Sequence, residues 1–172
     1  VWDEQETRSG TGIVYGMRVS QAGLPLDRGA FPILGNAAGV TNQGPTGTPV
    51  VEFDGPNFPV AAIEQAAGPC ASAGPRLVKL RFVTTAGAVM GAPITVNPGS
   101  TSCPDNVHRL TLSYANSAAG VYLLGYGRSF GSPLKTVVQT FIVTRSGGVT
   151  PTTPISTSTA PYDNPTSSWD GT

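Results

Sequence analysis

Charged side chains are scarce in this sequence, since Asp, Glu, Lys and Arg together make up 12% of its 172 residues, about half the share of a typical globular domain. The ten acidic and ten basic residues are scattered without runs, and they cancel to a formal net charge of zero. A protein that binds nucleic acid or an anionic membrane surface normally carries a basic stripe that neutralises phosphates. The charge pattern therefore argues against nucleic acid as a partner.

Metal-binding side chains are also few. The chain has one histidine, His108, and two cysteines, Cys70 and Cys103. A structural zinc site takes four ligands from Cys and His, and copper sites draw on the same residue types. We therefore expect neither a metal nor another cofactor.

Long apolar runs are missing as well. No stretch approaches the roughly 20 apolar residues that span a bilayer, so we expect no membrane insertion. No amphipathic helical pattern is visible either. Instead, 22 Gly and 16 Pro separate short runs rich in β-branched residues. This pattern predicts an all-β fold, an antiparallel β-sandwich of jelly-roll-like or Ig-like type.

The clearest strand is residues 76–83, in which Val78, Leu80 and Phe82 alternate with Lys79 and Arg81. An alternation of period two is typical of a half-buried strand. A turn at residues 86–87 and a second extended run at 88–96 predict a hairpin. Further strands are predicted at residues 13–20, 48–54, 58–64, 106–114, 121–126 and 135–144, with 30–34 as an edge strand because it contains a proline.

Two of these strands carry a predicted inward face. In residues 13–20 that face is Ile13, Tyr15, Met17 and Val19, with Val14 and Arg18 opposite. In residues 106–114 the sequence places His108, Leu110, Leu112 and Tyr114 on one face, with the intervening residues on the other. The strand at 121–126 is apolar on both faces and is predicted to be central.

Cys70 and Cys103 flank the predicted hairpin and are expected to form a disulfide at its base. In the chain-entropy model a loop of this length gives roughly 3 to 4 kcal/mol of stability. The alternative is two free buried thiols, which behave as small apolar side chains. A disulfide implies an oxidising compartment, so we expect an extracellular, cell-surface or virion-surface location.

Both ends of the chain differ in composition from the middle. We expect an N-terminal arm at residues 1–11, a single domain at 12–147 and an extended Thr/Ser/Pro-rich tail at 148–172. Such a tail buries little apolar area, and its only large apolar side chains are Ile155, Tyr162 and Trp169. We expect self-association through the arm or the tail, with these three residues as assembly contacts, and an assembly-deficient but folded protein on truncation after Gly148.

One motif suggests a hydrolase. Gly127–Gly131 reads G-x-S-x-G, the pattern of a nucleophile elbow centred on Ser129. The elbow requires an acid and then a histidine after the serine, whereas His108 precedes it. No acidic residue lies between the two for the opposite order. The segment is therefore predicted to be a tight turn with Phe130 pointing inward.

Two other residue pairs suggest chemistry or binding. Glu52 and Asp54 lie two residues apart on a predicted strand and therefore face the same side. They are an acid pair for glycoside hydrolysis, a calcium site or a solvated structural pair. Tyr122 and Tyr126 share a strand face, where aromatic rings stack on sugars or fill a core.

Taken together, the residues favour a non-enzymatic structural or adhesive surface module. It would be a subunit of an extracellular filament or the projecting domain of a viral coat or spike. The alternatives are a glycan-binding, lectin-like domain that uses Tyr122 and Tyr126, and a glycosidase-like enzyme that uses Glu52 and Asp54. Expected partners are other copies of the chain and a glycan or a host or cell-surface receptor.

Overall fold

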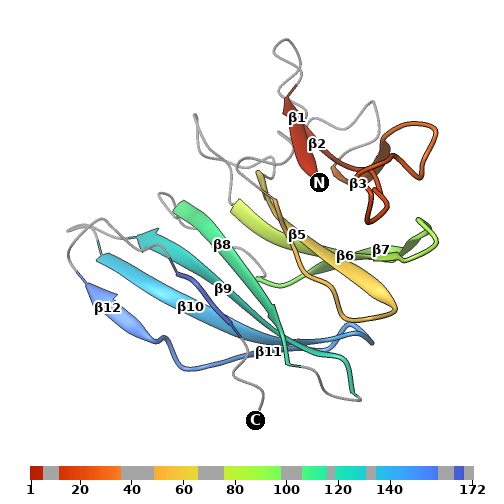
Figure 1. Cartoon of the computed structure of the whole chain (residues 1–172). Helices are drawn as coiled ribbons and strands as arrows, with labels where there is room; N and C mark the ends of the chain where they lie inside the picture. The colour runs from red at the N-terminus through yellow and green to blue at the C-terminus, as the bar shows by residue number, and fades with distance from the viewer. Residues whose placement is uncertain are drawn as a thin grey trace.

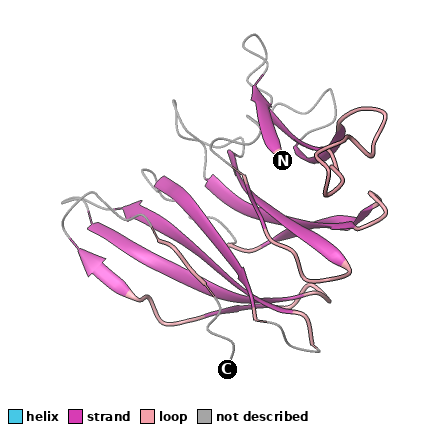
Figure 2. Cartoon of the chain, viewed as in Figure 1, coloured by secondary structure: helices cyan, strands magenta, loops and turns pink. Residues whose placement is uncertain are grey.

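The structure is a computed structural model that describes residues 1–5, 12–35, 49–65, 76–97, 106–115, 119–130, 135–158 and 165–168. All the regular elements in these residues are β-strands, and every pair of neighbouring strands is antiparallel (Figures 1 and 2). This confirms the all-β, antiparallel prediction. No helix in the described part of the chain is long and apolar enough to cross a membrane.

The strands form three sheets in chain order. The N-terminal sheet contains β1 (Trp2–Gln5), β2 (Gly12–Gly16) and β3 (Phe31–Gly35). The middle sheet contains β4 (Val50–Val51), β5 (Asn57–Gln65), β6 (Arg76–Thr84) and β7 (Val89–Thr95). The C-terminal sheet has the order β11-β10-β9-β8, with β12 also on β10, and comprises β8 (Asn106–Tyr114), β9 (Val121–Phe130), β10 (Lys135–Thr144), β11 (Val149–Pro151) and β12 (Ser156–Ser158).

The order of the strands differs from the jelly-roll-like or Ig-like connectivity that was expected. Neighbouring strands in each sheet follow one another along the chain, apart from β12, which returns to β10. Jelly rolls and Ig-like domains instead place strands that are distant in sequence side by side. The described sheets are therefore meanders, built from successive hairpins.

Strand β5 of the middle sheet buries side chains on both of its faces. Its residues alternate between two cores: Ala61 and Ile63 belong to a large core shared with the C-terminal sheet, while Val60 and Ala62 belong to a smaller core shared with the N-terminal sheet. A strand with two buried faces needs apolar residues at consecutive positions. Figure 1 shows the resulting arrangement, with β5, β6 and β7 between the other two groups of strands.

The side chains of β6 alternate between the two faces of the sheet, as predicted. Val78, Leu80 and Phe82 are at most 5% exposed and lie in the large core. On the opposite face, Arg81 donates from Nη1 to the Ile33 carbonyl at 3.0 Å and from Nη2 to the Gly91 carbonyl at 2.6 Å. The guanidinium therefore ties β3 of the N-terminal sheet to the middle sheet.

The predicted face of residues 13–20 is wrong. Val14, opposite the predicted face, is fully buried, whereas Met17 and Val19 are exposed because β2 ends at Gly16. A Cβ on Gly16 would lie 2.6 Å from Ile33 Cδ1, so a larger residue here would require the Ile33 side chain to move. The adjacent strand β3 lies at the edge of its sheet, as its proline predicted.

The inward face predicted for β8 agrees with the structure only after a bulge in the strand. Arg109 has a φ of 54°, and the pairing with β9 shifts register between His108 and Leu110. The extra residue changes which side chains point inward. Val107 is therefore buried before the bulge, and Leu112 is buried after it.

Strand β9 is central, as predicted, but it is longer than the sequence suggested. It pairs with β10 along its whole length up to Phe130, so the turn predicted from Gly127 is wrong. Ser129 is buried within the strand, and its hydroxyl lies 3.4 Å from that of Thr136. The ten residues of β10 provide an uninterrupted partner, and this outweighs the turn tendency of the glycines.

The arm and the tail belong to the sheets. Residues Trp2–Gln5 pair with β2, so this part of the arm is an edge strand. In the tail, β11 and β12 both pair with β10 and together form its outer neighbour. Further on, the Ser167 hydroxyl lies 2.6 Å from that of Thr111 and 2.5 Å from that of Ser113. The described part of the tail is therefore a clasp on its own chain.

Several predictions concern residues outside the described part of the chain. These are the Cys70–Cys103 disulfide and the assembly contacts Tyr162 and Trp169. They stay predictions.

Candidate functional site

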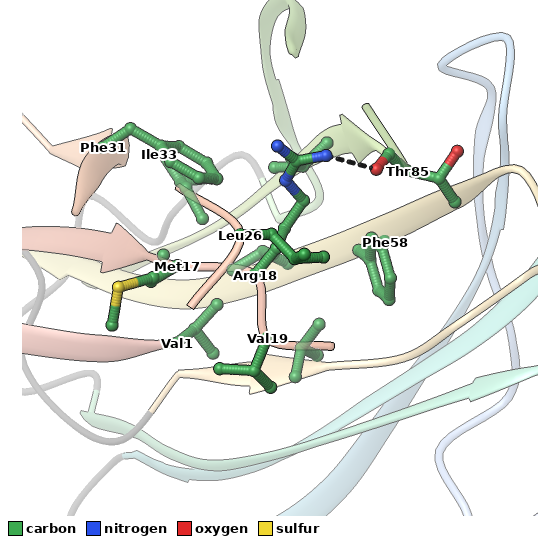
Figure 3. A pocket seen from close by; sticks show the side chains of 13 residues that line it. Val1, Met17, Arg18, Val19, Leu26, Phe31, Ile33, Phe58 and Thr85 are labelled. Carbon is green, nitrogen blue, oxygen red and sulfur yellow. Dashed lines mark hydrogen bonds between the residues drawn. The ribbon is translucent and has the colours of Figure 1, made fainter. Parts of the chain in front are cut away.

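A pocket of about 290 Å³ lies where the N-terminal sheet meets the middle sheet. Figure 3 shows side chains around it that include Phe31 and Ile33 from β3 and Phe58 from β5. Its lining is mostly apolar and comprises Val1, Gly16, Met17, Arg18, Val19, Leu26, Phe31, Ile33, Val51, Phe58, Val60, Val83 and Thr85. A concave apolar site of this size is the usual form of a binding site.

One side of the pocket is built by a small hairpin-like turn at residues 17–26. Val19 bridges to Pro25, the Ser20 N–H donates to the Leu24 carbonyl at 2.8 Å, and the Leu26 N–H donates to the Arg18 carbonyl at 3.0 Å. Gly23 makes the reversal with a φ of 79°. This turn holds Val19 and Leu26 at the pocket, 59% and 57% exposed.

Exposed apolar side chains gather around this pocket. Among the described residues, nine large apolar side chains are exposed, and seven form what we call the apolar collar. Five of the seven line the pocket, Leu24 belongs to the turn, and Phe53 packs on the pocket residue Phe58 with ring centroids 4.9 Å apart. The collar comprises Val1, Met17, Val19, Leu24, Leu26, Val51 and Phe53, which are 37% to 65% exposed. A group of exposed apolar side chains around one pocket is typical of an interaction site.

The guanidinium of Arg18 in the pocket lining is already paired. Arg18 donates from Nη2 to Asp27 Oδ1 at 2.5 Å and from Nη1 to the Thr85 carbonyl at 2.7 Å (Figure 3 shows the second bond). The hydrogen bond to Asp27 raises the pKa of Arg18, and the same bond lowers the pKa of Asp27. The two charges compensate each other, so the pocket is suited to an uncharged apolar group.

A second polar cluster joins the middle and C-terminal sheets around Asp54. This carboxylate is 6% exposed and follows β4. Its Oδ1 accepts the Asn57 N–H at 2.6 Å. Its Oδ2 accepts the Tyr122 hydroxyl and two bonds from Arg145, at 2.7 Å from Nη2 and 3.2 Å from Nε. Every oxygen of the buried carboxylate therefore has a donor.

The cluster shifts the pKa of each member in the direction that favours the ion pair. Burial acts to raise the pKa of Asp54, but the bonds from Tyr122, Asn57 and Arg145 outweigh it, so the pKa lies below its usual value. Burial and the bond to Asp54 raise the pKa of Tyr122. The bonds to Tyr122 and Asp54 raise the pKa of Arg145. At neutral pH the cluster holds a carboxylate, a neutral phenol and a guanidinium.

This arrangement predicts acid-sensitive stability. Because folding lowers the pKa of Asp54, the contribution of its carboxylate is present above the usual pKa of 3.8 and is lost as pH falls below it. The free energy of unfolding of the native protein should therefore exceed that of Asp54→Asn by about 2 kcal/mol at pH 6. Urea titrations should show that this gap narrows between pH 5 and pH 3. A gap that does not change with pH would show that the carboxylate is not stabilised as a charge.

The structure favours the structural alternative for both residue pairs that the sequence singled out. Glu52 is half-buried and Asp54 is buried with all its acceptors used, so the two do not form an open acid pair. Tyr122 is fully buried and packs on Phe82, and Tyr126, 3% exposed, stacks on Phe141. Both tyrosine rings are thus core residues, which agrees with the packing alternative. Among the described residues, no three His, Cys, Asp or Glu side chains gather as a metal site would require.

The sequence prediction missed Arg145. Arg145 lies in the turn after β10, far along the chain from Asp54, and the only available signal was that a buried acid needs a cation. Gly23-Leu-Pro25 marks a reversal in the sequence, and the structure has the reversal there, but Met17 and Val19 were assigned to the strand before it, which ends at Gly16.

Comparisons of the chain with protein-family models, with curated proteins and with solved structures find no match. The apolar collar is therefore the feature of this chain that points most directly to a function.

Proposed function

We propose that this chain is a non-enzymatic structural or adhesive module of an exterior surface, and that it assembles with other copies through the apolar collar. The observation that carries the proposal is the concentration of exposed apolar side chains around one neutral pocket. As part of the proposal, the middle and C-terminal sheets are the two layers of a β-sandwich, with the N-terminal sheet packed on the outside.

Energetics support an assembly contact. Burying a Val, Leu, Met or Phe side chain fully is worth roughly 1.5 to 3 kcal/mol. The collar contains seven such partly exposed side chains in one region, and their burial against another protein would offset the entropy of association. The exterior location rests on the expected Cys70–Cys103 disulfide and on the low charge content.

The two alternative functions, a glycan-binding domain and a glycosidase-like enzyme, have less support in the geometry. Sugar stacking needs accessible aromatic faces beside polar groups, whereas Tyr122 and Tyr126 fill the core. A glycosidase needs two carboxylates that reach a substrate, whereas the oxygens of Asp54 accept bonds from Asn57, Tyr122 and Arg145.

Sedimentation velocity over a concentration series tests the proposal. The native protein should associate, and Val19→Asp should abolish association by placing a charge in the collar. Met90→Asp is the matched control, because Met90 is 40% exposed on β7 and does not line the pocket. A native protein that stays monomeric, or a Val19→Asp protein that associates like the native one, would overturn the proposal.

A further inference from the structure

Ile155 protrudes from the sheet at the other end of the chain. It is 69% exposed, the highest value among the exposed large apolar side chains that the structure describes. It lies in the short connection between β11 and β12, and Pro151, Thr153 and Pro154 beside it are also exposed. We call Pro154 and Ile155 the knob.

The backbone of the knob is fixed to the sheet. The Ile155 N–H donates to the Val138 carbonyl at 3.0 Å, and the Thr152 N–H donates to the Thr140 carbonyl at 3.0 Å. Pro154 restricts φ immediately before Ile155. A preorganised apolar group loses little conformational entropy on binding, so the knob is suited to insertion into a partner.

The pocket matches the knob in size and polarity. A cavity of about 150 Å³ lined by apolar side chains accommodates benzene. The pocket of about 290 Å³ therefore has room for the four carbons of an isoleucine side chain and part of an adjacent proline ring. The charges of Arg18 and Asp27 compensate each other at its rim, and the whole chain has a formal net charge of zero, so two copies do not repel each other.

Knob and pocket lie on different sheets of one molecule. The knob follows β11 on the outer side of β10, whereas the pocket lies between the N-terminal and middle sheets. Figure 1 shows the middle strands between these two regions. A chain therefore cannot insert its own knob into its own pocket. Contact between two different patches is heterologous, and repetition produces a ring or a filament.

We propose that the occupant of the pocket is the Ile155 knob of a second copy of this chain, so that copies join head to tail. This inference rests on the proposed function and adds its partner surface and its symmetry. Loss of the buried isoleucine should weaken association by about tenfold to a hundredfold.

Mixing two defective variants tests the head-to-tail contact. Ile155→Asp has a damaged knob and an intact pocket, whereas Val19→Asp has an intact knob and a damaged pocket. Each variant alone should be monomeric. An equimolar mixture should form one-to-one pairs with twice the 17.6 kDa monomer mass, and it should stop there because the remaining knob and pocket are both damaged. Circular dichroism melting of each variant checks that it is folded, and Ile155→Val should assemble like the native protein.

The outcomes separate this inference from the proposed function. If Val19→Asp prevents association but Ile155→Asp does not, the collar is an assembly surface whose occupant is not the knob, and this inference is overturned alone. If each variant alone is monomeric and the mixture also stays monomeric, the intact knob and the intact pocket do not bind each other, and this inference is overturned too. If neither variant affects association, both proposals are wrong. A photo-activated leucine analogue at position 155 should crosslink to residues 17–26 or 51–60 of an isotopically distinct copy.

Discussion

Replacing Arg145 with alanine is expected to lower the free energy of unfolding by about 3 kcal/mol. The substitution leaves the carboxylate of Asp54, 6% exposed, without its cation and with only the Tyr122 hydroxyl and the Asn57 N–H as donors. A buried charge that loses its partner is one of the few single changes with an effect of this size. The loss of stability should come from weaker packing between the middle and C-terminal sheets, because Asp54 follows β4, Tyr122 is in β9 and Arg145 follows β10.

Urea unfolding at pH 7 measures this effect, with Arg28→Ala as the matched control because Arg28 is exposed in the loop before β3. The control should change stability by less than about 0.5 kcal/mol. The double variant Arg145→Ala, Asp54→Asn should be more stable than the sum of the two single losses predicts, because the second change removes the uncompensated charge. Equal losses for Arg145→Ala and Arg28→Ala would show that the cluster does not join the sheets.

Truncation after Gly148 should destabilise the fold and cause aggregation. It removes β11 and β12, which are the partners of β10 on its outer side, and it removes Val149, which packs on the large core. Several interstrand hydrogen bonds are lost at about 1 kcal/mol each. The ten-residue β10, rich in Val, Ile and Thr, then becomes an open edge, and such edges pair with other chains. This replaces the expectation from composition that the truncated chain folds normally.

Truncation after Ser158 provides the control. It keeps β11 and β12 and removes residues 159–172, and with them the contacts of Ser167 with Thr111 and Ser113. Thermal melting and light scattering should show a modest loss of melting temperature and no aggregates for this form. If truncation after Gly148 gives a soluble monomer with a native melting temperature, the outer strand is dispensable.

Strands with a strict alternation could be predicted from the sequence. Val78, Leu80 and Phe82 alternate with basic residues, and β6 buries these three side chains. The inward face of β2 could not, because two of its three buried residues are Gly12 and Gly16, which carry no apolar side chain to mark it. The inward face of β8 could not, because a bulge at Arg109 breaks the period of two. The bulge depends on the neighbouring strand and not on local propensity.

The candidate site was harder to predict than the strands. Composition correctly identified Ile155 as a rare large side chain in a polar segment, but the pairing of that segment with β10 depends on contacts between strands. The pocket needs the turn at residues 17–26 to lie against β5, which a single sequence does not specify. Asp54 was singled out for chemistry, whereas its donors come from β9 and from the turn after β10.

Hydrogen exchange measured on the native protein at low and at high concentration tests most directly whether the apolar collar is an assembly surface. Association through the collar predicts that backbone amides in residues 17–26 exchange more slowly at high concentration, while those around Met90 in β7 keep the same rate. Unchanged exchange in residues 17–26 under conditions where the protein does associate would contradict it.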